Sequence, residues 1–237
     1  MASKKLNLFI KFYKNGNIKV GNNIWTFSKL AGSGVVNGVK GTCGKYCEGC
    51  YNPNNPNKSL CYAVKTYGYY PSTRVGHARN TLDMRVYPRE SFEALDGYIR
   101  RARKLPVAIR IHASGEIETP EELKAWFKLA RKHPNLPFYI YTKAYDIVDK
   151  VLSTTNIPSN FYLNISIWHE FGIACYNRWK HRPNVRAFVY EDGYEYPFKA
   201  DVHCPAYKTG KLDHRFTCDK CKLCFEKKNK ICFCHDH

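Results

Sequence analysis

Two groups of closely spaced cysteines constrain this chain more than any other feature of its sequence. Eleven cysteines occur among 237 residues, and most of them lie in segments that are otherwise polar. No apolar run resembles a secretory signal or a membrane span, so we expect a soluble cytoplasmic protein whose thiols stay reduced. In that setting clustered cysteines are more often metal ligands than disulfides. We therefore expect at least one metal centre.

The first group lies in a loop that is rich in asparagine, proline and tyrosine. Cys43, Cys47 and Cys50 have the spacing C-x3-C-x2-C, and Cys61 follows eleven residues later. Three thiolates on one loop can bind three irons of a [4Fe-4S] cluster and leave one iron open to a small ligand. With Cys61 as the fourth ligand, the same group can instead close around a structural Zn ion. The spacing leaves both alternatives open.

The second group lies in a basic C-terminal segment with few apolar residues. Cys218, Cys221 and Cys224 have the spacing C-x2-C-x2-C, with Cys204 before them and Cys232, Cys234, His235 and His237 after them. Soft thiolate and imidazole ligands suit a tetrahedral Zn site, and thiolates alone suit a second iron–sulfur cluster. A segment with so little apolar surface needs a metal in order to fold. We expect Cys204 or His235 to be the fourth ligand.

Positive charge indicates the class of partner. Lys and Arg outnumber Asp and Glu by 38 to 20, which gives a formal net charge of +18 and a pI of about 9.4. Such a field concentrates polyanions, so DNA or RNA is the expected partner and a membrane is not. Tyr70, Arg74 and Arg79 combine an aromatic ring with guanidinium groups, which suits base stacking and phosphate contact. The alternative is a helix whose basic residues only face water.

Hydrophobic periodicity predicts alternating strands and helices in the middle of the chain. Strands are expected at 107–113, 138–143, 161–168 and 185–190, and helices at 91–104 and 146–152. Thr119, Pro120 and Glu122 predict the capped start of another helix. This order predicts an α/β fold with a largely parallel sheet, either open or curled into a partial (β/α) barrel.

The chain divides into three expected parts. Residues 1–40 read as an N-terminal hairpin and a glycine-bearing loop, and 41–200 as the α/β core, which includes the cysteine loop 43–61. Residues 201–237 read as a C-terminal Cys/His metal-binding segment.

Polar residues end three successive predicted strands. They are His112, Ser114, Gly115, Glu116, Lys143, Asn164 and Ser166. Ligands of α/β sheets bind at the carboxyl ends of the strands, so these side chains are candidates for one site. Glu116, His112 and Lys143 are the candidate catalytic groups, and Glu116 can also hydrogen-bond an amine. The alternative is an ordinary polar strand end with an exposed Glu116.

Several short motifs together resemble the phage-encoded gene product 88 family. They include Thr26-Phe27-Ser28, Cys61-Tyr62-Ala63, Tyr70-Pro71-Ser72, Arg110-Ile111-His112, Tyr141-Thr142-Lys143 and Cys204-Pro205-Ala206. The resemblance implies a phage protein that acts in the cytoplasm of the host cell. This chain has Glu116 where the family pattern is expected to carry an aspartate.

A more distant similarity is to radical S-adenosylmethionine enzymes. Their cysteine loop is similar to Cys43, Cys47 and Cys50, and their Gly-Gly-Glu strand end is similar to Ser114-Gly115-Glu116. The similarity implies a [4Fe-4S] cluster whose open iron binds the amine and carboxylate of S-adenosylmethionine, which is then cleaved reductively to a 5′-deoxyadenosyl radical. Asn164 and Ser166 are further candidates for cofactor contact. The leading hypothesis is a radical-SAM-like enzyme that modifies a nucleic acid base or nucleotide.

Two other functions stay open. A queuine-type base-exchange transglycosylase would use Glu116 as its catalytic carboxylate and Cys218, Cys221, Cys224 and His235 as Zn ligands. A non-enzymatic, zinc-stabilised protein would bind host nucleic acid or a host protein, with both cysteine groups structural.

Overall fold

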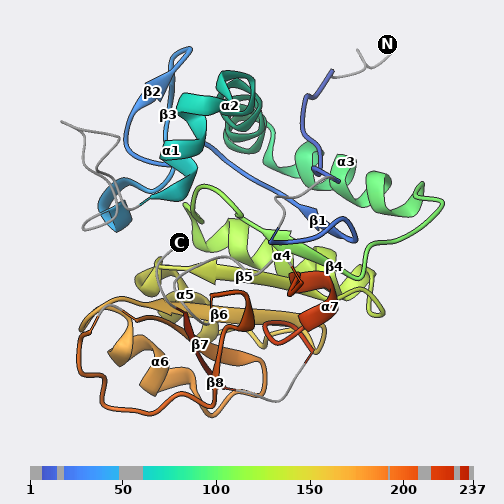
Figure 1. The fold of residues 1–237 in the computed structure, drawn as a ribbon. Coiled ribbons are helices and arrows are strands. Elements are labelled where there is room, and N and C mark those ends of the chain that lie inside the picture. The colour runs from blue at the N-terminus through green and yellow to red at the C-terminus, as the bar shows by residue number, and fades with distance from the viewer. Residues whose placement is uncertain are drawn as a thin grey trace.

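The computed structural model describes residues 7–14, 19–47, 61–191, 193–207, 215–226 and 230–234. Their centre is a seven-stranded sheet in which every neighbouring pair runs parallel (Figure 1). Across the sheet the strands are β1 (Ile24–Thr26), β4 (Ala108–Ile111), β5 (Phe138–Thr142), β6 (Phe161–Ile167), β7 (Val185–Tyr190), β9 (Ile231–Cys234) and β8 (Val202–His203). The expected α/β class with a largely parallel sheet is confirmed, and all seven strands place their carboxyl ends at one edge.

Helices connect the parallel strands. They are α1 (Tyr62–Tyr69), α2 (Pro71–Val86), α3 (Pro88–Arg100), α4 (Pro120–Lys132), α5 (Tyr145–Leu152), α6 (Ile173–Trp179) and the short α7 (Cys218–Cys221). The predicted start of α4 is confirmed, since the Thr119 hydroxyl accepts a 3.1 Å hydrogen bond from the Glu122 backbone N–H. No helix in the described ranges is long and apolar enough to cross a membrane.

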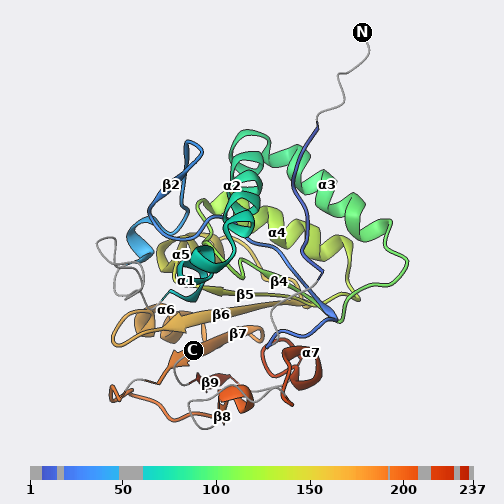
Figure 2. The ribbon, with the colours of Figure 1, turned by 45° about the horizontal axis from the view of Figure 1, so that its top comes forward.

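The two faces of the sheet have different coverings. Figure 2 shows α2, α3 and α4 on one side of the sheet and α7 on the other. The side chains of β5 alternate accordingly: Phe138 and Ile140 belong to the large core with Trp126 of α4, whereas Tyr139 packs with Phe225 of the tail. The Tyr139 and Phe225 rings stack with centroids 4.9 Å apart. We call these the helix-facing and tail-facing sides.

Both ends of the chain contribute to the sheet. Within the segment expected to be a hairpin and loop, Ile24–Thr26 forms β1 and pairs with β4, and the hairpin itself consists of β2 (Val35–Val36) and β3 (Val39–Lys40). The C-terminal segment supplies β8 and β9, which extend the sheet beyond β7. After β1 the chain passes through the β2–β3 hairpin, and the cysteine loop follows β3 and begins with a short 3-10 helix, η1 (Gly44–Cys47).

Candidate functional site

The cysteine loop meets the Ser114–Glu116 turn where β1 and β4 end. Thr42, which precedes Cys43, accepts a 2.8 Å hydrogen bond from the Glu116 backbone N–H through Oγ1. The same hydroxyl donates to the Leu30 carbonyl at 3.0 Å. The Lys29 backbone N–H donates to the Ser114 carbonyl at 2.9 Å. Segments more than seventy residues apart are thus held in contact at the carboxyl edge of the sheet.

Gly115 permits this close approach. Its φ is +81°, in the left-handed region that favours glycine. A Cβ at this position would lie 2.7 Å from Thr42 Oγ1 and 2.9 Å from the Lys29 carbonyl oxygen. Any larger residue would therefore push the base of the cysteine loop away from the turn.

Glu116 joins β4 to β5 through its carboxylate. Its Oε1 accepts hydrogen bonds from the Thr142 hydroxyl at 2.7 Å and the Ile117 N–H at 2.8 Å, and its Oε2 accepts one from the Lys143 N–H at 2.8 Å. Burial raises the pKa of Glu116, although these three donors favour the ionised form. The structure thus brings together Glu116, Ser114, Gly115 and the Lys143 backbone.

His112 lies in a different network, on the helix-facing side. Its Nε2 is 2.8 Å from Glu122 Oε1, and its ring contacts Phe27 and Trp126. Glu122 also forms a 2.8 Å ion pair with the fully buried Lys29. His112 has a φ of +49°, so the chain turns sharply there and separates it from Glu116.

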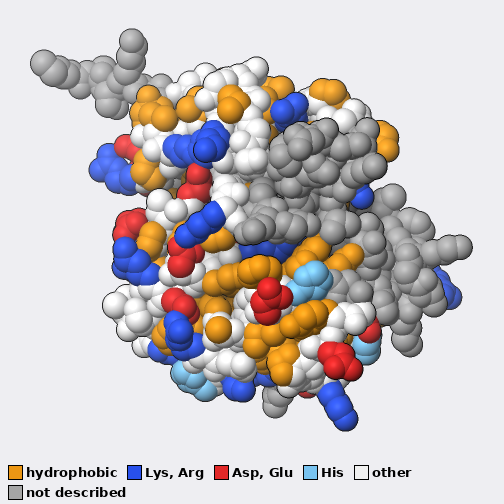
Figure 3. All heavy atoms as spheres, turned by 90° about the vertical axis from the view of Figure 1, so that its left-hand side faces the viewer, with side chains coloured by type: hydrophobic (Ala, Val, Ile, Leu, Met, Phe, Trp, Pro, Cys, Tyr) orange, Lys and Arg blue, Asp and Glu red, His pale blue; other side chains and the backbone are white. Residues whose placement is uncertain are grey.

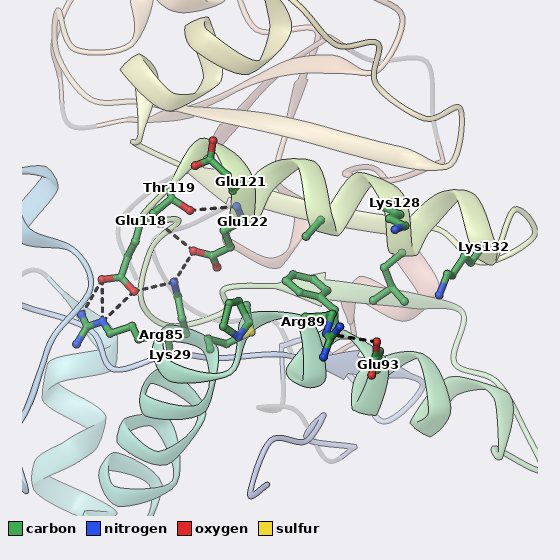
Figure 4. Close-up of a pocket in the computed structure, with 15 residues that line it drawn as sticks. Lys29, Arg85, Arg89, Glu93, Glu118, Thr119, Glu121, Glu122, Lys128 and Lys132 are labelled. Atoms are coloured by element: carbon green, nitrogen blue, oxygen red, sulfur yellow. Dashed lines mark hydrogen bonds and ion pairs between the residues drawn. The ribbon is translucent and has the colours of Figure 1, made fainter. Parts of the chain in front are cut away.

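A cavity of ≈ 700 Å³ opens beside this ion cluster, between α2, α3 and α4 (Figure 4). Lys29, Glu118 and Glu122 lie at one end, joined by dashed lines, and Arg89 and Lys132 lie toward the other. Burial acts to raise the pKa of Glu122, but Lys29 and His112 outweigh it and hold that pKa well below its ordinary range. Desolvation lowers the pKa of His112.

Tyr67 of α1 holds the turn from the other side, although no motif or spacing marks this tyrosine as a site residue. Its hydroxyl lies 2.8 Å from Ser114 Oγ and 3.0 Å from His77 Nδ1, and it accepts from the Ala31 N–H at 3.0 Å. Burial lowers the pKa of His77 to about 4, so this ring is neutral at neutral pH. The buried partners fix the Ser114 side chain in one orientation.

The first cysteine group is described only in part. Cys43 is half-buried, and its sulfur accepts a 3.4 Å hydrogen bond from the Gly32 N–H. Cys61 precedes α1, and both thiols pack against the small cluster around Leu30. The backbone of Cys47 ends η1, but its side chain and the whole of Cys50 lie outside the described residues.

The second group gathers around a narrow cavity of ≈ 30 Å³ on the tail-facing side. The cysteines that line it are Cys204, Cys218, Cys221, Cys224 and Cys232. The Cys232 and Cys224 thiols interact with each other, as do the Cys234 and Cys204 thiols. His235 lies outside the described residues. Cys232 is one of the surplus tail ligands of the sequence and not the expected fourth one; the C-x-C spacing on one strand places Cys232 and Cys234 on the same face.

In the described ranges no group of three or more His, Cys, Asp or Glu side chains is arranged so that it could hold a metal ion. The iron and Zn ligands therefore stay predictions.

Polar side chains of the sheet lie beneath the tail cysteines. Asn164 donates from Nδ2 to the Ile140 carbonyl at 3.1 Å and to the Cys224 carbonyl at 3.4 Å. The guanidinium of the half-buried Arg110 lies 5.0 Å from the Tyr141 ring centroid. The Ser166 carbonyl accepts from the Tyr145 hydroxyl at 2.6 Å. Of the predicted cofactor residues, Asn164 thus contacts the tail rather than the Ser114–Glu116 turn.

The predicted nucleic-acid residues are all exposed. Tyr70 precedes α2, and Arg74 and Arg79 lie on it. Five residues of helix separate the two arginines, a rotation of about 140°, so they point to different sides of α2. The Arg79 guanidinium lies 4.6 Å from the Phe9 ring centroid.

A family model described as Gene product 88 matches residues 5–227. No curated protein and no solved structure matches the chain. The family match covers all but the ends of the sequence, including the Ser114–Glu116 turn and the cysteines from Cys43 to Cys224. The family expected from the short motifs is confirmed: the chain belongs to the gene product 88 family.

Proposed function

We propose that this protein is an iron–sulfur enzyme of the radical-SAM type that modifies a nucleic acid base or nucleotide. The observation that carries the proposal is the 2.8 Å hydrogen bond from the Glu116 N–H to Thr42 Oγ1. It joins the start of the C-x3-C-x2-C loop to the Ser-Gly-Glu turn at the ends of two adjacent parallel strands. A cluster on the loop and an amino acid group on the turn would then be neighbours.

The donors of the loop fit an iron–sulfur cluster. Cys43, Cys47 and Cys50 offer three soft thiolates at short spacing. The Gly32 N–H donates to Cys43 Sγ, and N–H donors of this kind stabilise the charge of a cluster thiolate and tune its potential. Cys61 packs against the same Leu30 cluster as Cys43 and is the alternative fourth ligand for Zn.

Each residue of the turn has a proposed role. Gly115 lets the backbone come within reach of the bound methionyl group, and Ser114 is held ready by Tyr67. Glu116 acts as a positioning residue, since both of its carboxylate oxygens already accept hydrogen bonds from β4 and β5. When bound, the cluster and S-adenosylmethionine would supply reductive cleavage of a carbon–sulfur bond.

The same Glu116 contacts weigh against base exchange. A transglycosylase needs a carboxylate that reaches its substrate, and this one is buried and hydrogen-bonded within the protein.

For the tail we propose a second, structural metal centre, with Zn as the metal. Five cysteines line one narrow cavity there, and two pairs of thiols are already in hydrogen-bond contact. Four thiolates satisfy a tetrahedral Zn ion, and Cys204, Cys218, Cys224 and Cys232 are the proposed set.

Metal analysis of anaerobically purified protein tests both centres. We expect a brown protein with broad absorption and about four irons bound by the first cysteine group, together with about one Zn per chain. Cys47→Ala should remove the iron and the colour. The matched variant Cys175→Ala, which removes a core thiol, should keep both. Colourless protein that contains only Zn would refute the enzyme proposal.

A further inference from the structure

We infer that a cavity at the carboxyl edge of the sheet binds one base of a single-stranded nucleic acid. The cavity has a volume of ≈ 270 Å³ and is lined by Lys45, Tyr46, Lys143, Tyr145, Trp168 and Phe171. It lies beside the proposed reaction site, because the Lys143 N–H donates to Glu116 Oε2 at 2.8 Å. The volume is just under the roughly 300–1,000 Å³ of sites for drug-sized ligands, which suits one flat ring system.

The aromatic walls are held in place before any ligand binds. Trp168 stacks on Tyr190, with ring centroids 4.5 Å apart and planes 10° apart. Backbone hydrogen bonds in both directions, at 3.2 and 3.0 Å, connect Trp168 to Phe171. The Tyr46 hydroxyl donates to Asp146 at 2.5 Å, and that of Tyr145 to the Ser166 carbonyl at 2.6 Å. Rigid aromatic walls lower the entropy cost of stacking a base.

Lys143 gives the cavity its preference for a nucleotide over an uncharged ring. The Lys143 ammonium lies 4.6 Å from the Trp168 ring centroid, whereas that of Lys45, 5.2 Å from the Tyr46 centroid, is paired with Asp146 at 2.7 Å. The ammonium of Lys143 therefore occupies the indole face that a stacked base would cover. Its flexible stem allows it to move to the adjoining phosphate when the base enters. Aromatic faces beside ammonium groups are the usual chemistry of single-strand recognition.

A row of rings leads away from the cavity and indicates a strand rather than a free nucleotide. The His169 ring follows Trp168 with centroids 6.0 Å apart, Tyr194 follows His169 at 5.3 Å, and Tyr196 follows Tyr194 at 5.0 Å. Figure 3 shows a face of the molecule on which hydrophobic side chains gather in a broad patch. Successive bases can stack along such a row without sequence preference.

Fluorescence anisotropy of labelled single-stranded DNA and RNA of about ten nucleotides tests the inference. Phe171 is 49 % exposed, so Phe171→Ala should leave the fold intact. We expect it to weaken binding about 5- to 100-fold without changing the salt dependence, because the loss is one of stacking. Phe216→Ala removes an equally exposed ring (43 %) outside this cavity and should bind like the wild type.

The variant Lys143→Gln distinguishes the contribution of charge to oligonucleotide binding from the contribution of stacking. It should weaken binding and also reduce the slope of log K against log salt by about 0.7, the value of one phosphate contact on a single strand. Adenosine monophosphate should compete far more weakly than the oligonucleotide, since it occupies only one position of the row.

Equal affinities of Phe171→Ala and wild type would overturn the inference, as would a mononucleotide that binds as tightly as the strand. The choice of substrate rests on the proposed function, but the binding measurement requires neither iron nor S-adenosylmethionine. Iron content, in turn, requires no oligonucleotide. A failure of one proposal is therefore distinguishable from a failure of the other.

Discussion

The two sides of the sheet bury charge in opposite ways. On the helix-facing side, the fully buried Lys29 has two carboxylate partners, Glu118 at 3.1 Å and Glu122 at 2.8 Å. On the tail-facing side, the half-buried Arg110 lies close to the hydroxyls of tyrosines and to the Cys218 thiol. Its Nε has no hydrogen-bond partner in the described residues. Lys29 thus has carboxylate partners, whereas among the described residues Arg110 forms no ion pair with a carboxylate.

The two sides of the sheet therefore differ in what compensates their buried positive charge. A buried cation is stable only when a compensating charge lies close to it. Lys29 has that charge from its own polypeptide, whereas thiolates bound to a metal ion would provide it for Arg110. The helix-facing side should thus be insensitive to metal, and the tail-facing side should respond to it.

The largest effect on stability is expected when the ion pairs of Lys29 on the helix-facing side are removed. Lys29→Met leaves Glu122 buried without its cation and should lower the free energy of unfolding by about 3–5 kcal/mol. Urea denaturation measures the loss. Lys45→Met is the matched control, because its ion pair with Asp146 is exposed and should contribute no more than about 1 kcal/mol. Similar losses in both variants would contradict the role given to Lys29.

The second prediction concerns pH. Burial lowers the pKa of His77 to about 4 from 6.5, so as the pH falls below 6.5 the unfolded chain takes up a proton before the folded protein does. Stability should fall between pH 6.5 and 4, by about 3 kcal/mol at the lower end, and His77 should add no further loss below that.

His77→Gln should flatten this part of the profile, measured as the difference from wild type in urea midpoints at each pH. The exposed His181→Gln should leave the profile unchanged. If the His77→Gln variant has the same pH profile as the wild type, the loss of stability comes from another titrating group.

The smallest effect is expected on the tail-facing side, and its sign should depend on metal. In metal-free protein, Arg110→Met removes a half-buried cation whose buried Nε has no hydrogen-bond partner among the described residues, and it should stabilise the fold by about 1–3 kcal/mol. In metal-loaded protein the same change should destabilise it, since an anionic centre loses its cation. Melting curves with and without Zn, beside an exposed Arg103→Met control, measure the difference. A stability change of the same sign in both forms would contradict the expected dependence of the tail-facing side on metal.

Local patterns predicted the strands and helices of the core because those signals depend on neighbouring residues. Val185–Tyr190 forms a strand at the predicted positions, and the Thr119 cap starts α4 as expected. β1 was missed because Ile24–Thr26 is only three residues long, and it is a strand through its pairing with Ala108–Arg110. Such pairing between distant segments leaves no periodic signal.

The site was predictable in its residue types but not in its contacts. Ser114, Gly115 and Glu116 lie together at the expected strand end, beside the expected cysteine loop. His112 belongs to the opposite network because the backbone turns at its positive φ and ends the alternation of the strand. Cys232 becomes a neighbour of Cys224 only when β9 pairs with β7, a contact that local spacing does not encode.

The position of β9 also bears on how the protein is made. β8 precedes β9 in the chain, yet β9 lies between β7 and β8, so β8 has no place in the sheet until residues 231–234 have been synthesised. A growing chain on the ribosome therefore carries β7 as an open edge strand, with its backbone groups free to pair with other chains. Pairing of β9 with β7 therefore also removes an edge at which the growing chain could aggregate.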